Sequence, residues 1–150
     1  MAVFREKPYS NYNFLVDLGV GDSSGIKAGF SEVILPPAAI DVIQYRSGNE
    51  RESGVRKIPG RVHYGNIIFK RGLIGSLDLY SWWNDVLNGD VNAARTVTVQ
   101  LQNEDHTDVV FTWKFLRAWP MRYEFSPLEA RGKETLLEIL ELAFERMEIE

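Results

Sequence analysis

The alternation of hydrophobic and polar positions along the chain predicts a mainly β protein. Residues 13–18 form an aromatic and branched run that ends in turn residues, which is typical of a strand. Glycine, aspartate and serine crowd residues 19–25 and predict a hairpin-type loop, after which residues 26–34 are expected to return as a second strand. Further strands are predicted over residues 41–45, 61–70, 96–101, 109–119 and 121–125, the last two separated by Pro120.

One segment, residues 76–88, has the periodicity of an amphipathic helix. Its apolar side chains recur with the spacing i, i+3, i+4, i+7 and i+8, at Leu79, Trp82, Trp83, Val86 and Leu87. The Ser76 hydroxyl is expected to cap the helix N-terminus, where Asp78 also suits the positive end of the helix dipole. Gly89 suits a left-handed C-terminal cap, so the pattern predicts both ends of the helix.

The pattern leaves two alternatives open. Trp82 and Trp83 are expected in the core, the alternative being that one of them faces a neighbouring subunit, because aromatic residues are enriched at interfaces. Residues 134–147 carry a helical apolar stripe, yet Leu140 and Leu142 within them also have the spacing of a strand. Local propensity alone favours a helix over this range.

The composition indicates a globular protein with one domain over residues 1–150. The chain is 45% hydrophobic and 25% charged, and it contains no apolar run long enough to span a membrane. Its first ten residues lack the apolar stretch of a signal peptide, so neither a leader nor a membrane anchor is expected. Zero cysteines exclude disulfides and thiolate chemistry. The net charge of −4 argues against a nucleic-acid-binding surface.

No motif for catalysis or for a cofactor is present. The glycines of residues 19–25 lack the spacing of a nucleotide-binding loop, and a strand rather than a helix is expected after them. His63 and His106 have no metal-ligand spacing, and no Gly-x-Ser-x-Gly nucleophile motif occurs. The sequence therefore predicts a protein that is not an enzyme and that holds no cofactor and no metal ion.

A polar loop of mixed charge separates two of the predicted strands. It comprises Arg46, Ser47, Gly48, Asn49, Glu50, Arg51, Glu52, Ser53, Gly54, Val55 and Arg56. This composition permits a mobile surface loop. The alternative is a segment that orders against a neighbouring subunit or ring, because mixed charges suit complementary head-to-tail surfaces.

The order of several short motifs resembles the tail tube proteins of contractile phages and of extracellular contractile injection systems. A strand that ends in Lys70, Arg71 and Gly72 passes directly into the helix with Trp82 and Trp83. The other similar segments follow in the order of the family, at residues 8–17, 29–33, 44–48, 56–60, 113–120 and 141–145. Lys70 and Arg71 are expected at a solvated or intersubunit-paired strand end, with an anion site as the alternative.

The resemblance implies an antiparallel β-barrel or two-sheet sandwich with one flanking α-helix, the Hcp-like tail tube fold. It implies rings of six copies that stack into a hollow tube inside a sheath. Contraction of the sheath would drive the tube through a target envelope and deliver cargo. The loop at residues 46–56 would make contacts between rings and between neighbours, and residues 134–147 would form a strand that closes a sheet, which is the structure we predict there.

The resemblance also implies partners and a location. The partners would be further copies of the chain, the sheath protein, baseplate or adaptor and cap proteins, and cargo in the lumen. The protein would be made in the cytoplasm and assembled into a phage tail or an injection particle. Two alternatives remain open: a tube-initiating or baseplate-adaptor paralogue of the same fold, and a monomeric β-barrel that binds a small ligand. Whether the tube would conduct DNA or protein is also open.

Overall fold

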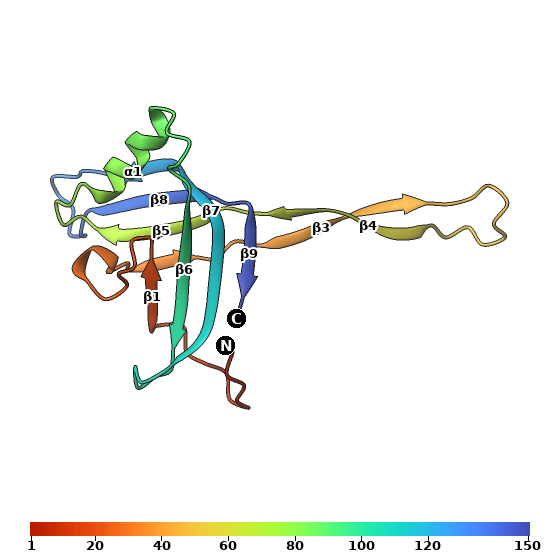
Figure 1. Ribbon diagram of the computed structural model, residues 1–150, viewed down its shortest axis with the longest axis horizontal. Helices are drawn as coiled ribbons and strands as arrows, with labels where there is room; N and C mark the ends of the chain where they lie inside the picture. Colours follow the sequence, from red (N-terminus) through yellow and green to blue (C-terminus); the bar gives the residue numbers. More distant parts are fainter.

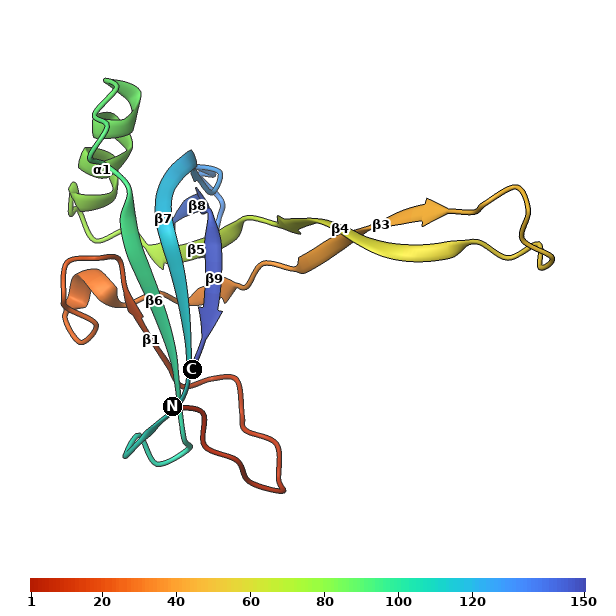
Figure 2. The ribbon, with the colours of Figure 1, turned by 45° about the vertical axis from the view of Figure 1, so that its right-hand side comes forward.

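The computed structural model describes residues 1–150, and its elements form a body with one long projecting arm (Figures 1 and 2). In chain order the elements are β1 (Phe14–Asp17), the 3-10 helix η1 (Ile26–Ala28), β2 (Glu32–Ile34), β3 (Ala38–Tyr45), β4 (Arg56–Tyr64), β5 (Ile67–Gly72), α1 (Asp78–Leu87), β6 (Arg95–Gln102), β7 (Val109–Phe125), β8 (Leu137–Ala143) and β9 (Arg146–Ile149). The arm is the ribbon of β3 and β4.

Two antiparallel sheets share the long strand β7. One sheet holds β1, β6, β9 and the first part of β7, and the other holds β2, β5, β8 and the last part of β7. β7 changes sheet near Arg117, which has a left-handed φ of 54°. The predicted fold, mainly antiparallel with one helix, is confirmed. The path of paired strands ends at β1 and β2, which do not pair with each other, so one chain alone does not close a barrel.

The core lies between the two sheets. Every second side chain of their strands points into it, because side chains alternate between the two faces of a strand. Ile67 and Phe69 on β5 are fully buried, as are Leu140 and Leu142 on β8. The other members of the core cluster come from the sheet of β1, β6 and the first part of β7, from α1 and from loops: Val16, Leu18, Phe30, Leu79, Trp82, Ala93, Val97, Val99, Phe115 and Ala118. The arm contributes no residue to this cluster.

The loop after β1 is not a hairpin, and residues 26–34 are not one strand. β1 pairs with β6 and β2 pairs with β5, while Ile26–Ala28 forms a 3-10 turn. The Asp17 carboxylate accepts hydrogen bonds from three backbone amides of this loop, and the Asp22 carboxylate accepts two more. Such local bonds between side chain and backbone stabilise a compact loop in competition with a strand.

Two other strand predictions need correction. The predicted strand over residues 61–70 is divided into β4 and β5 at Gly65, where a Cβ atom would lie 2.6 Å from the Pro37 ring. Only glycine fits this close approach, and the Gly65 N–H donates to the Pro37 carbonyl at 2.9 Å. Pro120 does not interrupt β7, because it lies at a register shift between β7 and β8, where a missing N–H is tolerated.

The helix starts slightly later than predicted. Leu77 rather than Ser76 occupies the N-cap position, and the Ser76 hydroxyl instead donates to the Asp78 carboxylate at 2.9 Å. At the other end, Gly89 has a φ of 81° and its N–H donates to the Val86 carbonyl. This is the left-handed cap that the sequence predicted.

The C-terminal segment is extended, as predicted from the family resemblance. Residues 134–147 contain β8 and the start of β9 and no helix. β8 pairs with β5 on one side and with β7 on the other. The pairing on both sides of β8 therefore overrides the helical propensity of its residues.

Candidate functional site

The β3–β4 arm is an antiparallel ribbon that lies almost wholly in solvent (Figure 1). All residues of β3 are exposed, and in β4 only Gly60 and Tyr64 are half-buried. The two strands pair only with each other. A two-stranded ribbon on its own is marginally stable in water, so we expect the arm to need a partner surface.

Apolar side chains occupy much of this exposed ribbon. Six large ones on the two strands are between 45% and 62% exposed: Ile40, Val42, Ile43, Tyr45, Ile58 and Val62. The register places Ile40 opposite Val62 and Ile43 opposite Ile58, and such cross-strand pairs hold a ribbon together. A row of exposed apolar side chains along a projecting ribbon indicates contact with another protein.

The tip of the arm contains the loop of mixed charge, residues 46–56. Arg46 folds the tip on itself by donating hydrogen bonds to the backbone oxygens of Glu50 and Glu52. A carboxylate oxygen of Glu50 lies 3.2 Å from Nε of Arg56. All but two residues of this loop are exposed. The tip is therefore a compact charged turn at the end of an apolar ribbon.

The helix residues that we expected to pack lie in different environments. Leu79 and Trp82 belong to the core cluster, and Val86 packs against it. The indole N–H of Trp82 donates to a backbone oxygen at 2.7 Å. Trp83 is half-buried outside this cluster, and Leu87 is 66% exposed. The buried face of α1 is thus narrower than the apolar stripe in the sequence.

Arg71 is buried inside the protein, whereas a solvated or intersubunit-paired strand end was expected there. Its guanidinium donates to the carboxylates of Asp78 and Glu138 at distances between 2.8 and 3.2 Å, and to the Lys27 carbonyl at 2.8 Å. The Tyr123 hydroxyl donates to the other Glu138 oxygen at 2.6 Å. We call these four side chains, Arg71, Asp78, Tyr123 and Glu138, the buried ion network. It ties the start of α1 to β5, β7 and β8.

The sequence contains a signal for this network in the phase of its charged residues, which no short motif captures. Arg71 alternates in phase with Ile67 and Phe69 on β5, and Glu138 alternates in phase with Leu140 on β8. The register places Arg71 directly opposite Glu138. A charged residue at the core phase of each of two strands indicates a buried ion pair, because an unpaired buried charge is costly.

Within the buried ion network, the hydrogen bonds favour the charged forms of Arg71 and Asp78. Burial opposes the charge of Arg71, but hydrogen bonds to Asp78 and Glu138 outweigh it and raise the pKa of the guanidinium. Burial also opposes the charge of Asp78, but bonds from Arg71 and Ser76 lower the pKa of its carboxyl. Burial, together with the bond to Glu138, raises the pKa of Tyr123 well above its usual value, so the phenol stays protonated.

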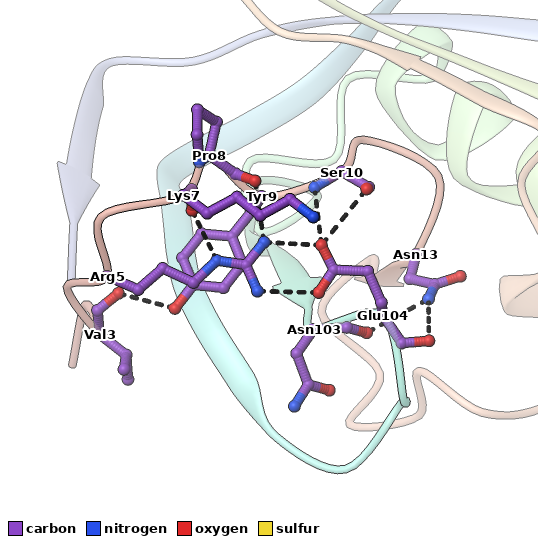
Figure 3. A network of polar contacts seen from close by, with 9 residues as sticks. All are labelled: Val3, Arg5, Lys7, Pro8, Tyr9, Ser10, Asn13, Asn103 and Glu104. Atoms are coloured by element: carbon purple, nitrogen blue, oxygen red, sulfur yellow. Dashed lines mark hydrogen bonds and ion pairs between the residues drawn. The ribbon is translucent and has the colours of Figure 1, made fainter.

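The N-terminal strap, residues 1–13, is attached to the turn between β6 and β7 (Figure 3). Arg5 forms a two-pronged ion pair with Glu104, with N–O distances of 2.6 and 2.9 Å. The same guanidinium lies 3.8 Å from the centre of the Tyr9 ring. Glu104 also accepts hydrogen bonds from the backbone and hydroxyl of Ser10. These contacts order a segment that has no helix or strand of its own.

The strap is expected to stay attached in mild acid. The hydrogen bonds from Arg5, more than any other contact, lower the pKa of Glu104 from 4.5 to about 2. Because the pKa is depressed in the folded state, the contribution of this pair is present above pH 4.5 and is lost as the pH falls toward 2. The Val3 amide, which donates to the Val110 carbonyl, should therefore stay protected from hydrogen exchange at pH 4. Glu104→Gln should remove this protection, and equal protection in both proteins would contradict the attachment.

The remaining candidate groups do not form a chemical site. His63 lies 2.7 Å from the Asp41 carboxylate on the arm, and His106 lies in the turn near Gln102. No group of three or more His, Asp or Glu side chains is arranged to hold a metal ion. Neither helix has the length and apolar character that crossing a membrane would require. The exposed arm is therefore the candidate functional surface.

A known family matches almost the whole chain. The model of the T4-like virus tail tube protein gp19 family matches residues 10–148. The chain belongs to this tail tube family. Members of this family are structural proteins of tail tubes, which is not a type of enzyme. No curated protein sequence matches this tail tube protein.

Solved structures of low identity share the fold of this tail tube protein. A chain of the PVC sheath-tube complex, from an extracellular contractile injection system in the extended state, is 24% identical with a TM-score of 0.83, over 97% of this chain and 93% of that chain. A chain of the tube terminating cap of the anti-feeding prophage is 24% identical with a TM-score of 0.83, over 100% and 95%. Hcp1 from Flavobacterium johnsoniae is 15% identical with a TM-score of 0.55, over 92% and 94%.

Proposed function

We propose that this tail tube protein is the main inner tube subunit of a contractile injection system or phage tail. Six copies form a ring, and the rings stack into a hollow tube inside the sheath. The exposed apolar arm carries this proposal, because a ribbon without a covering sheet gains stability only against another molecule. A contact between two unlike surfaces of identical copies repeats along the stacking direction and produces a filament.

The proposed partners follow from the particles in which the fold relatives were solved. Two of those relatives come from a sheath-tube complex and a tube terminating cap, and a further relative, 23% identical, comes from the baseplate of the anti-feeding prophage. We infer that this protein likewise meets a sheath protein, a baseplate or adaptor protein and a cap protein within an assembled particle. Cargo occupies the lumen and is delivered when the sheath drives the tube through a target envelope.

Electron microscopy of the purified protein in negative stain tests the proposal. A concentration series should show rings of six copies and, at higher concentration, hollow filaments of constant width. Monomers at every concentration would contradict a main tube that assembles by itself. That outcome would favour an adaptor paralogue that depends on a template, or a monomeric ligand-binding protein.

Charge reversal at the tip of the arm should weaken the stacking of rings. In a variant with Arg46, Arg51 and Arg56 all replaced by Glu, the tip would repel acidic groups that it meets on a neighbour. We expect filaments to appear only at a roughly tenfold or higher protein concentration, with the melting temperature nearly unchanged because the tip is exposed. Sedimentation and electron microscopy measure the first effect, and circular dichroism measures the second.

The control carries the same change of charge on the body. It replaces three exposed basic residues by Glu: Arg131, Lys133 and Arg146. This control should form filaments at a much lower concentration than the tip variant. If both variants assemble alike, net charge rather than the tip would govern assembly.

A further inference from the structure

A second exposed apolar surface lies where the end of β5, the start of α1 and the end of β7 meet. Its apolar lining, which we call the helix-start patch, consists of Leu73, Leu77, Tyr80, Tyr123 and Phe125. Leu77 is 70% exposed, and Leu73, Tyr80 and Phe125 are between 43% and 50% exposed. The helix-start patch is therefore a shallow apolar surface that is open to a partner.

The buried ion network holds the helix-start patch in shape from beneath. The Tyr123 ring contacts the rings of Tyr80 and Phe125, with centroid distances of 6.5 and 5.0 Å. The Tyr123 hydroxyl is bonded to Glu138, which in turn accepts hydrogen bonds from Arg71. The aromatic part of the patch is thus fixed before any partner arrives, which lowers the entropy lost on binding.

The arm and the helix-start patch lie at opposite ends of one strand. The arm joins the start of β5 through Gly65, and Leu73 of the patch directly follows the end of β5 (Figure 1). A strand of this length spans about 20 Å. A projecting element at one end and an apolar surface at the other provide the two unlike faces of a head-to-tail contact between copies.

The arm and the body also differ in charge. Residues 38–64 carry five Lys and Arg side chains against three Asp and Glu side chains. The net charge of the arm is therefore +2. Since the net charge of the whole chain is −4, the remaining residues together carry a net charge of −6. α1 holds two acidic residues, Asp78, which is already paired with Arg71, and Asp85, and it holds no basic residue. Opposite charges favour contact between the arm of one copy and the body of another.

We propose that the helix-start patch receives the β3–β4 arm of a second copy of this chain. This inference rests on the proposed tube function and names the surface that the arm meets. Apolar side chains of the ribbon, such as Val42 or Ile43, cover Leu77 and Tyr80. The basic tip then lies against the more acidic body.

Substitution of Leu77 tests this contact without harming the fold. Serine is favoured at helix N-caps, the position of Leu77, so Leu77→Ser should keep the melting temperature of the monomer. Loss of the apolar contact should raise the concentration at which rings or filaments appear about tenfold or more. The matched control is Leu87→Ser, at a similarly exposed position at the other end of α1, and it should assemble like the unchanged protein. Equal assembly of the two variants would overturn the inference.

Disulfide cross-linking tests the same contact directly, because the chain contains no cysteine of its own. Val42→Cys and Ile43→Cys, which place thiols on the two faces of the arm, are each mixed with Leu77→Cys and oxidised after assembly. One arm variant should form a heterodimer with Leu77→Cys, since a disulfide requires Cα atoms within about 7 Å. The same arm variant should react more slowly with Leu87→Cys.

The two proposals fail in different ways. If rings form but neither arm variant prefers Leu77→Cys over Leu87→Cys, the arm meets another surface and the helix-start patch is not its receptor. The tube function then stands. If the unchanged protein forms no rings under any condition in which the variants are compared, the proposed function and the inference built on it are both wrong.

Discussion

The Arg71→Met variant is expected to have a melting temperature on the order of 10 °C below that of the unchanged protein. The substitution leaves the Glu138 carboxylate buried and the Asp78 carboxylate half-buried without their cation. Removing one partner of a buried ion pair costs about 3–5 kcal/mol. Each kcal/mol lowers the melting temperature of a chain of this length by about 2–4 °C. Thermal unfolding followed by circular dichroism measures the change.

The neighbouring residue provides the control for this prediction. Lys70 pairs with Glu32 at 3.4 Å, but the Glu32 side chain is 52% exposed, so Lys70→Met should cost less than about 1 kcal/mol. Adding Glu138→Leu to Arg71→Met should restore part of the lost stability, because it removes an uncompensated buried charge. Equal melting temperatures for Arg71→Met and Lys70→Met would mean that the buried ion network does not stabilise the fold.

Removal of the arm is expected to abolish assembly and to leave the body folded. Ala39 and His63 lie opposite each other near the base of the arm, so residues 40–62 can be replaced by Asn-Gly, a two-residue turn suited to a hairpin. The melting temperature should change little, because the arm contributes nothing to the core cluster. Electron microscopy and analytical centrifugation should find monomers at concentrations at which the unchanged protein forms rings.

A shorter deletion separates the apolar ribbon from its charged tip. Tyr45 and Arg56 are also opposite each other, so residues 46–55 can be replaced by the same turn while the ribbon is kept. This variant should assemble more weakly than the unchanged protein and more strongly than the variant without the arm. If loss of the tip alone abolishes rings, the apolar side chains of the ribbon contribute little to the contact.

The parts of the fold that the sequence predicted are those that depend on local patterns. The helix was recognised from its periodicity and from Gly89, whose left-handed conformation ends it. The alternation in residues 96–101 likewise matches β6. The extended structure of residues 134–147 was predicted from the family resemblance, because their own periodicity also fits a helix. What favours the strand is the pairing of β8 on both sides, with β7, which precedes it in the chain, and with β5, which lies more than 60 residues earlier.

The features that the sequence analysis missed depend on contacts between distant segments. The division at Gly65 results from its close approach to Pro37, and the burial of Arg71 depends on Glu138, which belongs to a strand 67 residues further on. The mixed charges of residues 46–56 predicted a contact at the tip, whereas no pattern distinguished the apolar ribbon behind it from an ordinary strand. Alternating apolar residues usually indicate a strand that is half-buried in its own chain. Here nearly all side chains of both strands remain exposed, Tyr64 at the base of the arm being half-buried.

The passage of β7 through both sheets has a mechanical consequence. Two sheets that meet only through side chains can slide past each other when force is applied along one of them. Here a single covalent backbone crosses from one sheet to the other near Arg117, and it is hydrogen-bonded on both sides of the crossing. Shear between the sheets must therefore break strand pairing along β7 before they can separate. A subunit built in this way is suited to carrying compressive load without yielding at its centre.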